Sequence, residues 1–158
     1  MLWQKNLPGY LLRVFFSAAN FKITHIPDNA TLWRAVCRPE QIKNGKLKRG
    51  FFRDKRGLSC DLAIFSTIEK SRRGNLLPPW PEGSGLVEFE VATIRSENVQ
   101  SDVHHDPKKK VKRKNRKNYA HSILLPELSS PAEKWMLDDS NHRFVHKPNF
   151  SEPAISNA

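Results

Sequence analysis

Residues 86–94, LVEFEVATI, give the clearest indication of the fold. Val87 and Phe89 alternate with Glu88 and Glu90. Because successive side chains of a strand point to opposite faces of a sheet, this alternation predicts a strand with one face in a core and the other toward solvent. Antiparallel sheets commonly have this two-sided character, so the stretch favours an antiparallel sheet.

Two other stretches have the composition of strands. Residues 31–37, TLWRAVC, and 119–125, YAHSILL, are rich in β-branched, aromatic and aliphatic residues. With 86–94 they predict the core strands of an α+β fold, a mainly antiparallel sheet with a few short helices. Pro39 and Gly45 indicate a short helix near 39–43 that Gly45 ends, and capping boxes that begin at Ser66 and Ser130 predict helices near 66–73 and 130–137.

The length of 158 residues is typical of one domain. We expect a single small α+β domain over 1–138, with a polar and polybasic loop at 101–118. Apolar residues are sparse after 138, so 139–158 is expected to be a flexible tail. The first 27 residues combine an apolar stretch with three basic and no acidic residues. This pattern is typical of a first helix packed on the domain or of a processed N-terminal extension.

Ten residues hold much of the positive charge. The chain has 27 basic and 16 acidic residues, a net charge of +11, and residues 108–117, KKKVKRKNRK, contain eight of the basic ones. The other 19 exceed the acidic residues by only three, so the rest of the chain has an ordinary charge balance. The eight cations are Lys108, Lys109, Lys110, Lys112, Arg113, Lys114, Arg116 and Lys117.

This polybasic run predicts contact with a polyanion. A dense row of cations binds a phosphate backbone by releasing condensed counterions. Arg53 follows the aromatic pair Phe51 and Phe52, and we expect it to add a phosphate contact beside a stacking surface. No zinc finger, RNP-type aromatic pair or GXXG clamp is present, so little sequence specificity is expected. The alternatives are a solvated loop, a nuclear targeting signal, anionic lipid and an acidic protein partner.

A polar motif lies directly before the run. Residues 104–107 read HHDP, and His104 with Asp106 has the composition of a general acid or base beside an orienting carboxylate. Next to a cationic segment, such a pair suits metal-free cleavage of RNA. The same residues are typical of a polar turn before proline, and a metal site is a third interpretation.

Polar residues also interrupt the apolar runs. Arg34 lies in the first predicted strand, Ser59 and Asp61 lie in LSCDLAIF at 58–65, and His121 lies in YAHSILL. A charge within a strand is costly unless it is paired. Arg34 and Asp61 are therefore expected to lie mostly inside, within reach of each other or of His121, and a salt bridge between the two is the pairing that we expect first.

His121 is a candidate for chemistry near neutral pH. By alternation it shares a side with Ile123 and Leu125, so its ring is expected to face an apolar layer. An arginine on a first strand and a serine on a later one resembles the arrangement with which small ADP-ribosyltransferase-type toxins bind NAD. The resemblance implies a nucleotide or NAD site formed by Arg34, Ser59 and His121.

Several classes of protein are disfavoured. Cys37 and Cys60 form no CxxC pair, which favours reduced thiols in a cytoplasmic protein, or a nuclear one in a eukaryotic host. No apolar run has the length of a transmembrane helix. We expect no cofactor and no metal. The preferred function is a nucleic-acid-binding accessory protein, and the alternative is a small toxin-like ribonuclease or ADP-ribosyltransferase acting on RNA, a nucleotide or NAD.

Overall fold

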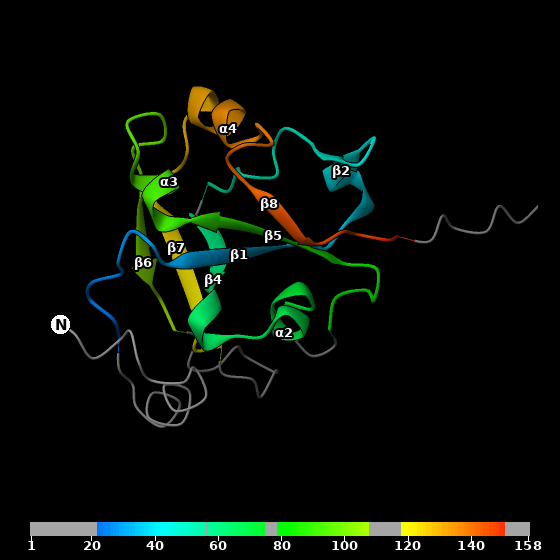
Figure 1. Cartoon of the computed structure of the whole chain (residues 1–158), viewed down its shortest axis with the longest axis horizontal. Helices are drawn as coiled ribbons and strands as arrows, with labels where there is room; N and C mark the ends of the chain where they lie inside the picture. Colours follow the sequence, from blue (N-terminus) through cyan, green and yellow to red (C-terminus); the bar gives the residue numbers. More distant parts are fainter. Residues whose placement is uncertain (1–21, 56, 75–78, 108–117, 151–158) are drawn as a thin grey trace, which may run out of the picture.

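A six-stranded sheet with the strand order β6-β7-β4-β1-β5-β8 forms the framework of the protein (Figure 1). The computed structural model describes residues 22–55, 57–74, 79–107 and 118–150, so most of the predicted N-terminal helix or extension lies outside the described residues. All neighbouring strands in this sheet are antiparallel, which confirms the predicted α+β class. The strands are β1 (Thr31–Val36), β4 (Leu58–Leu62), β5 (Gly85–Glu90), β6 (Asp102–His105), β7 (His121–Leu125) and β8 (Arg143–His146).

Short helices cover both sides of the sheet. Helices α3 (Val91–Arg95) and α4 (Ser130–Met136) lie on one side, and α2 (Ile68–Arg72) lies on the other (Figure 1). Two 3-10 helices, η1 (Pro39–Gln41) and η2 (Ala63–Phe65), follow β1 and β4 in the chain. A separate hairpin of β2 (Ile42–Lys43) and β3 (Lys46–Leu47) turns through Asn44 and Gly45. Both turn residues have positive φ, 52° and 74°, as a two-residue hairpin turn of this type requires.

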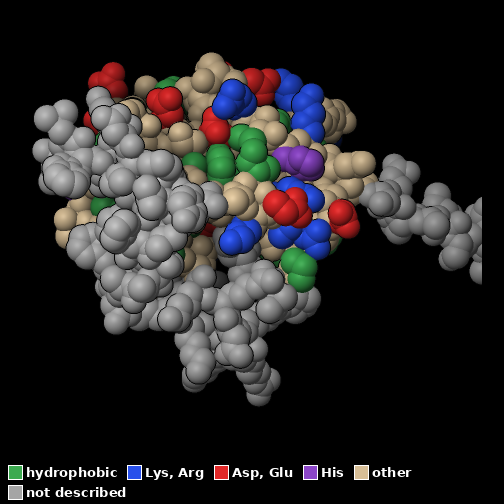
Figure 2. Space-filling model, turned by 60° about the horizontal axis from the view of Figure 1, so that its bottom comes forward, with side chains coloured by type: hydrophobic (Ala, Val, Ile, Leu, Met, Phe, Trp, Pro, Cys, Tyr) green, Lys and Arg blue, Asp and Glu red, His purple; other side chains and the backbone are tan. Residues whose placement is uncertain are grey.

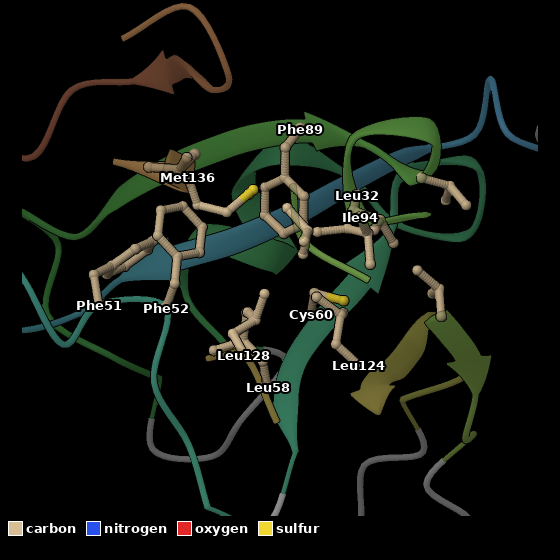
Figure 3. Close-up of a cluster of buried hydrophobic side chains, with 14 of the residues drawn as sticks. Leu32, Phe51, Phe52, Leu58, Cys60, Phe89, Ile94, Leu124, Leu128 and Met136 are labelled. Carbon is tan, nitrogen blue, oxygen red and sulfur yellow. The ribbon is translucent and has the colours of Figure 1, made fainter. Parts of the chain in front are cut away.

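The core lies on the face of the sheet that carries α3 and α4. Phe51 and Phe52 enter it from the loop before β4, and their rings stand nearly perpendicular at 82° with centroids 4.9 Å apart (Figure 3). Aromatic quadrupoles favour this edge-to-face arrangement. Each fully buried side chain of this size contributes about 1.5–3 kcal/mol through the hydrophobic effect. The sheet supplies Leu32, Val36, Leu58, Cys60, Leu62, Val87, Phe89 and Leu124, and the helices supply Ile94, Ala132 and Met136.

The observed strand β5 is shorter than the strand that the alternating pattern predicts at 86–94. β5 ends at Glu90, and Val91 begins α3. The backbone N–H of Val91 donates to the carbonyl of Ala30 at 3.0 Å. Val91 and Ile94 are three residues apart and both fully buried, so they share the inward face of a helix. The last apolar residues of the pattern therefore belong to α3.

Part of the polar loop predicted at 101–118 is a strand instead. Residues 102–105 form β6, which pairs with β7 along its length. Val103 and His105 are buried, whereas His104 is exposed. His105 takes the place of an apolar residue in the alternation because both of its ring nitrogens have hydrogen-bond partners inside the protein.

The segment predicted as a flexible tail, 139–158, contains an ordered strand. β8 pairs with β5 at the edge of the sheet, and Phe144 packs against the core. Beyond β8, the N–H of Asn149 donates to the carbonyl of Gly83 at 2.8 Å, which holds the chain close to the start of β5. A few apolar side chains and backbone pairing are sufficient here, although the local composition is polar.

The two capped helices begin close to their predicted positions. Thr67 caps α2 by accepting from the N–H of Lys70, and Ser129 caps α4 by accepting from the N–H of Ala132. The predicted caps, Ser66 and Ser130, each lie one residue away from the observed ones. Neighbouring hydroxyl residues make the sequence signal ambiguous by one position.

A buried carboxylate fixes the loop that carries the two core phenylalanines. Glu133 of α4 is fully buried, and it accepts a hydrogen bond from the backbone N–H of Gly50. Its other oxygen accepts from Nη2 of Arg53 at 2.7 Å. The loop before β4 is thus attached to α4 on both sides of Phe51 and Phe52.

Replacing Glu133 with alanine should lower the free energy of unfolding by ~1.5–3 kcal/mol, because the variant cannot form hydrogen bonds to a buried charged group. Urea unfolding monitored by tryptophan fluorescence measures this change. Glu127→Ala, at an exposed position before α4, is the matched control and should stay within about 0.5 kcal/mol of the wild type. Equal stability of the two variants would show that Glu133 does not hold the loop.

Candidate functional site

A pocket of about 590 Å³ opens where β1 and β4 separate. The two strands pair at Leu32↔Leu62 and Trp33↔Asp61, and no pairing continues toward Val36. On its other edge, β1 stays paired with β5 over its whole length. The pocket therefore receives residues from both faces of the sheet, with Arg34, Ser59, Asp61 and His121 among its lining.

Arg34 occupies the gap between the two strands. Its Nη1 donates to the carbonyl of Ser59 at 2.6 Å, and its Nε donates to the carbonyl of Phe51 at 3.1 Å. Its guanidinium carbon lies 5.2 Å from the centroid of the Phe51 ring, a cation–π contact. Burial lowers the pKa of Arg34 from its ordinary value, yet arginine stays protonated throughout the physiological range. A fixed positive charge thus stands at the base of the pocket.

The predicted salt bridge between Arg34 and Asp61 is not formed among the described residues. Asp61 lies opposite Trp33 in the register, so its side chain points to the other face of the sheet from Arg34. Asp61 is 8% exposed and accepts from Ser71 Oγ at 2.7 Å and from Asn118 Nδ2 at 2.9 Å. Both residues are buried or half-buried as expected, but each has other partners.

A serine, a histidine and an aspartate form a hydrogen-bonded chain at the pocket. His121 Nε2 lies 3.3 Å from Ser59 Oγ. On the other side of the ring, His121 Nδ1 lies 2.8 Å from the backbone carbonyl of Asp106 and 3.5 Å from its carboxylate oxygen. A carbonyl can only accept, so Nδ1 carries the proton and Nε2 presents its lone pair to Ser59. The arrangement is chemically that of a base poised on a hydroxyl.

The apolar surroundings predicted for His121 are wrong. Ser122 and Leu124 of β7 are the residues that point into the core, whereas Leu125 is 42% exposed. His121 faces the opposite side, next to Asp61 in the register. In AHSILL each phase of the alternation has two apolar residues and one polar residue, and the small Ser122 fits the core because its hydroxyl donates to the carbonyl of Ala120.

Cations of one chain segment line the pocket. Arg38, Lys48, Arg49 and Arg53 are all exposed and contribute to its wall, together with the acidic residues Glu40 and Asp54. Arg53 is partly neutralised, because it is paired with Glu133. Figure 2, which brings the lower side of Figure 1 forward, shows lysine and arginine side chains mixed with acidic ones over the part of this face that is not grey.

The other predicted site residues have different locations. His104 is exposed on β6, opposite Ile123, and does not line the pocket. Asp106 joins the site through His121. The eight cations of the polybasic run at 108–117 lie outside the described residues. Before this run the chain leaves β6 at His105, after it the chain enters β7 at His121, and the two strands are antiparallel neighbours.

The pocket also contains residues that the sequence did not single out. Asn118 bonds Asp61, and Trp33 donates from Nε1 to Glu88 at 3.0 Å. Trp80 covers Gly74, where an added Cβ would meet its ring at 2.6 Å. Single aromatic and amide residues carry no local pattern that distinguishes a pocket wall from a core.

The two cysteines are free, and neither is an activated thiol. Burial raises the pKa of Cys60 and that of the half-buried Cys37 from their ordinary values. Cys37 lines the pocket, yet its thiol is mostly protonated at neutral pH. In the described residues no group of three or more histidine, cysteine or acidic side chains has the arrangement of a metal site.

Comparison with protein-family models, with curated proteins and with solved structures gives no match. No helix in the described part of the chain has the length and hydropathy of a membrane-spanning segment.

His105, the neighbour of His104, should make stability depend on pH. Its Nδ1 accepts from the N–H of Ile23 and its Nε2 bonds the carbonyl of Tyr119, so the folded state holds it neutral. Burial lowers its pKa. The stabilisation is complete above the unfolded value of about 6.5 and disappears as the pH falls below it. Urea midpoints measured between about pH 7.5 and 5.5 should decrease, and less so in His105→Gln. An unchanged slope in that variant would exclude His105 as the cause.

Proposed function

We propose that the protein binds nucleic acid through the phosphate backbone, with little sequence specificity. The observation that carries the proposal is that the described residues flanking the polybasic run in the sequence are bonded to the pocket. The run starts two residues after Asp106 and ends directly before Asn118. Asp106 bonds His121, and Asn118 bonds Asp61, and both of these partners line the pocket.

The charge of the described pocket supports the same partner. Arg34, Lys48 and Arg49 line it, so the described pocket itself provides cations that a phosphate backbone could contact. Phosphates bound by such cations release counterions, which gives affinity that falls steeply with salt. Glu40 and Asp54 line the same pocket, and their negative charges confine the positive potential to the region close to the cations.

Substitution of all eight basic residues at 108–117 with glutamine should remove most of the affinity for single-stranded RNA and DNA. The slope of log K against log salt should become shallower by about 0.7 for each phosphate that the protein no longer neutralises. Fluorescence anisotropy with labelled oligonucleotides, between about 50 and 200 mM salt, measures both quantities. Undiminished affinity would refute the role of the run.

A second pair of variants distinguishes the effect of cations in the pocket wall on binding from the effect of the overall net charge. Lys48→Gln with Arg49→Gln changes two lining cations, and Lys43→Gln with Lys134→Gln changes two exposed lysines away from the pocket. The first pair should weaken binding more than the second, although both remove two charges. An acidic peptide of matched charge that competes as well as RNA would favour a scaffold protein with an acidic partner instead.

One observation favours a second candidate function, a small enzyme acting on RNA or a nucleotide. The pocket brings together Arg34, Ser59 and His121, and Asp106 orients the ring of His121. A histidine with a fixed tautomer can move a proton, and Arg34 can stabilise charge on a phosphoryl oxygen. The same cations also suit the diphosphate of NAD, as the resemblance to ADP-ribosyltransferase-type toxins implies.

His121→Gln distinguishes binding from catalysis. Glutamine preserves much of the size and hydrogen bonding but cannot titrate near neutral pH. If the protein is an enzyme, cleavage of RNA or consumption of NAD should fall about 10²–10⁴-fold while oligonucleotide affinity stays nearly constant. His146→Gln, exposed on β8 and outside the pocket, is the control. Turnover that survives His121→Gln would exclude His121 as the acid or base.

A further inference from the structure

We propose that Ser59 is the nucleophile of a phosphodiester-transfer site and that His121 is its general base. The proposal rests on the proposed function for its substrate, the phosphate backbone of a nucleic acid. It adds that the attacking oxygen comes from the protein, so the reaction does not require the 2′-hydroxyl of RNA.

The position of Ser59 is the first argument. It is exposed on β4, and its hydroxyl lies at the pocket, 3.3 Å from the unprotonated nitrogen of His121. This separation is close to hydrogen-bond reach and typical of nucleophile–base pairs before a substrate is bound. A substrate hydroxyl would have to displace Ser59 from this nitrogen, whereas Ser59 is already in place.

The orientation of His121 is the second argument. The hydrogen bond from Nδ1 to the backbone of Asp106 fixes both the tautomer and the ring plane. The carboxylate of the same residue, 3.5 Å away, stabilises the imidazolium that forms when Nε2 takes up a proton. The side chain of His121 is 13% exposed, so bulk water screens this attraction only in part.

Arg34 is the third argument, since it provides a charge for the developing anion. Among the described residues it donates from Nε and Nη1, which leaves Nη2 for a ligand. Its bond to the backbone carbonyl of Ser59 holds the guanidinium at the main chain of the nucleophile residue, and both residues line the same pocket. Charge that develops on the phosphoryl oxygens in the transition state is stabilised by such a fixed cation.

The transfer step is balanced without a further reactant, and the hydrolysis that follows consumes only water. Ser59 Oγ forms a bond to phosphorus as its proton moves to His121 Nε2. The bond from phosphorus to the departing ribose oxygen breaks, and that oxygen receives the proton from Nε2. The product is a phosphoserine diester, which water hydrolyses by the same route in reverse, with His121 again accepting a proton. No oxidant, reductant or metal enters either step.

Covalent capture tests the nucleophile. A fluorophosphonate probe reacts with activated serines, and mass spectrometry locates the adduct. A labelled all-deoxy oligonucleotide with a bridging phosphorothiolate traps the protein–phosphate ester, because its sulfur leaves irreversibly. We expect both reagents to modify Ser59 and the adducts to fall at least about 10²-fold in His121→Gln. Ser59→Ala should abolish them.

Ser140→Ala is the matched control, because Ser140 is an exposed serine bonded to a carboxylate, Asp138, with no histidine at its hydroxyl. It should leave labelling unchanged. Wild-type protein that binds the oligonucleotide but gives no adduct with either reagent would overturn the proposal. So would cleavage of RNA that persists in Ser59→Ala and fails on the all-deoxy strand. Probe labelling of Ser59 without oligonucleotide binding would support the nucleophile and overturn the nucleic-acid substrate.

Discussion

The separation of β1 from β4 beyond Trp33 and Asp61 is the constraint on which the site depends. A continuous ladder would satisfy the carbonyl of Ser59 with a backbone N–H of β1. In this protein the guanidinium of Arg34 satisfies it instead, and it also bonds the carbonyl of Phe51. The strands can diverge because one buried charge replaces the missing backbone partners. The pocket is the space that this divergence creates.

The loop before β4 forms part of the wall of that pocket. Glu133 attaches the loop to α4 through Gly50 and Arg53, while Phe51 and Phe52 fill the core between them. The same loop therefore contributes core side chains, a hydrogen-bond acceptor for Arg34 and cations of the pocket wall. Stability and site geometry are coupled here, since movement of the loop would displace the partners of Arg34.

On the face of the sheet opposite the core, polar side chains form a hydrogen-bond network with defined donors and acceptors. Ser71 of α2 and Asn118 both donate to Asp61, while Asp106 accepts from His121. These bonds hold the two ends of the segment 106–118 against the sheet. They also give His121 a single tautomer whose basic nitrogen faces Ser59. A site with one defined proton acceptor and one fixed cation is suited to phosphate chemistry, and this is consistent with the proposed contact between the polybasic run and a phosphate backbone.

Several elements follow from local pattern alone. The strands at β1 and β7 and the helix caps near Thr67 and Ser129 are close to prediction, because alternation and capping act over a few residues. The Asn44–Gly45 turn also carried a local signal, the dipeptide favoured in two-residue hairpins, although the glycine was interpreted as the end of a helix. Other elements depend on partners distant in the chain. β5 gives way to α3 because Ala30 accepts from Val91, and His105 occupies a core position because Ile23 and Tyr119 bond its ring.

The sequence by itself determined the composition of the candidate site, since Arg34, Ser59, Asp61 and His121 stand out as polar residues in apolar strands. A polar or charged side chain within an apolar strand has an energetic cost, so such residues can be identified from the sequence before the fold is known. Only the tertiary structure decided which of them meet. Register places Asp61 away from Arg34 and beside His121, and strand divergence turns Arg34 toward Ser59. Which strands pair, and in which register, is a property of the whole sheet. Residue type therefore identifies the candidate site residues, whereas the topology of the sheet decides which of them contact one another.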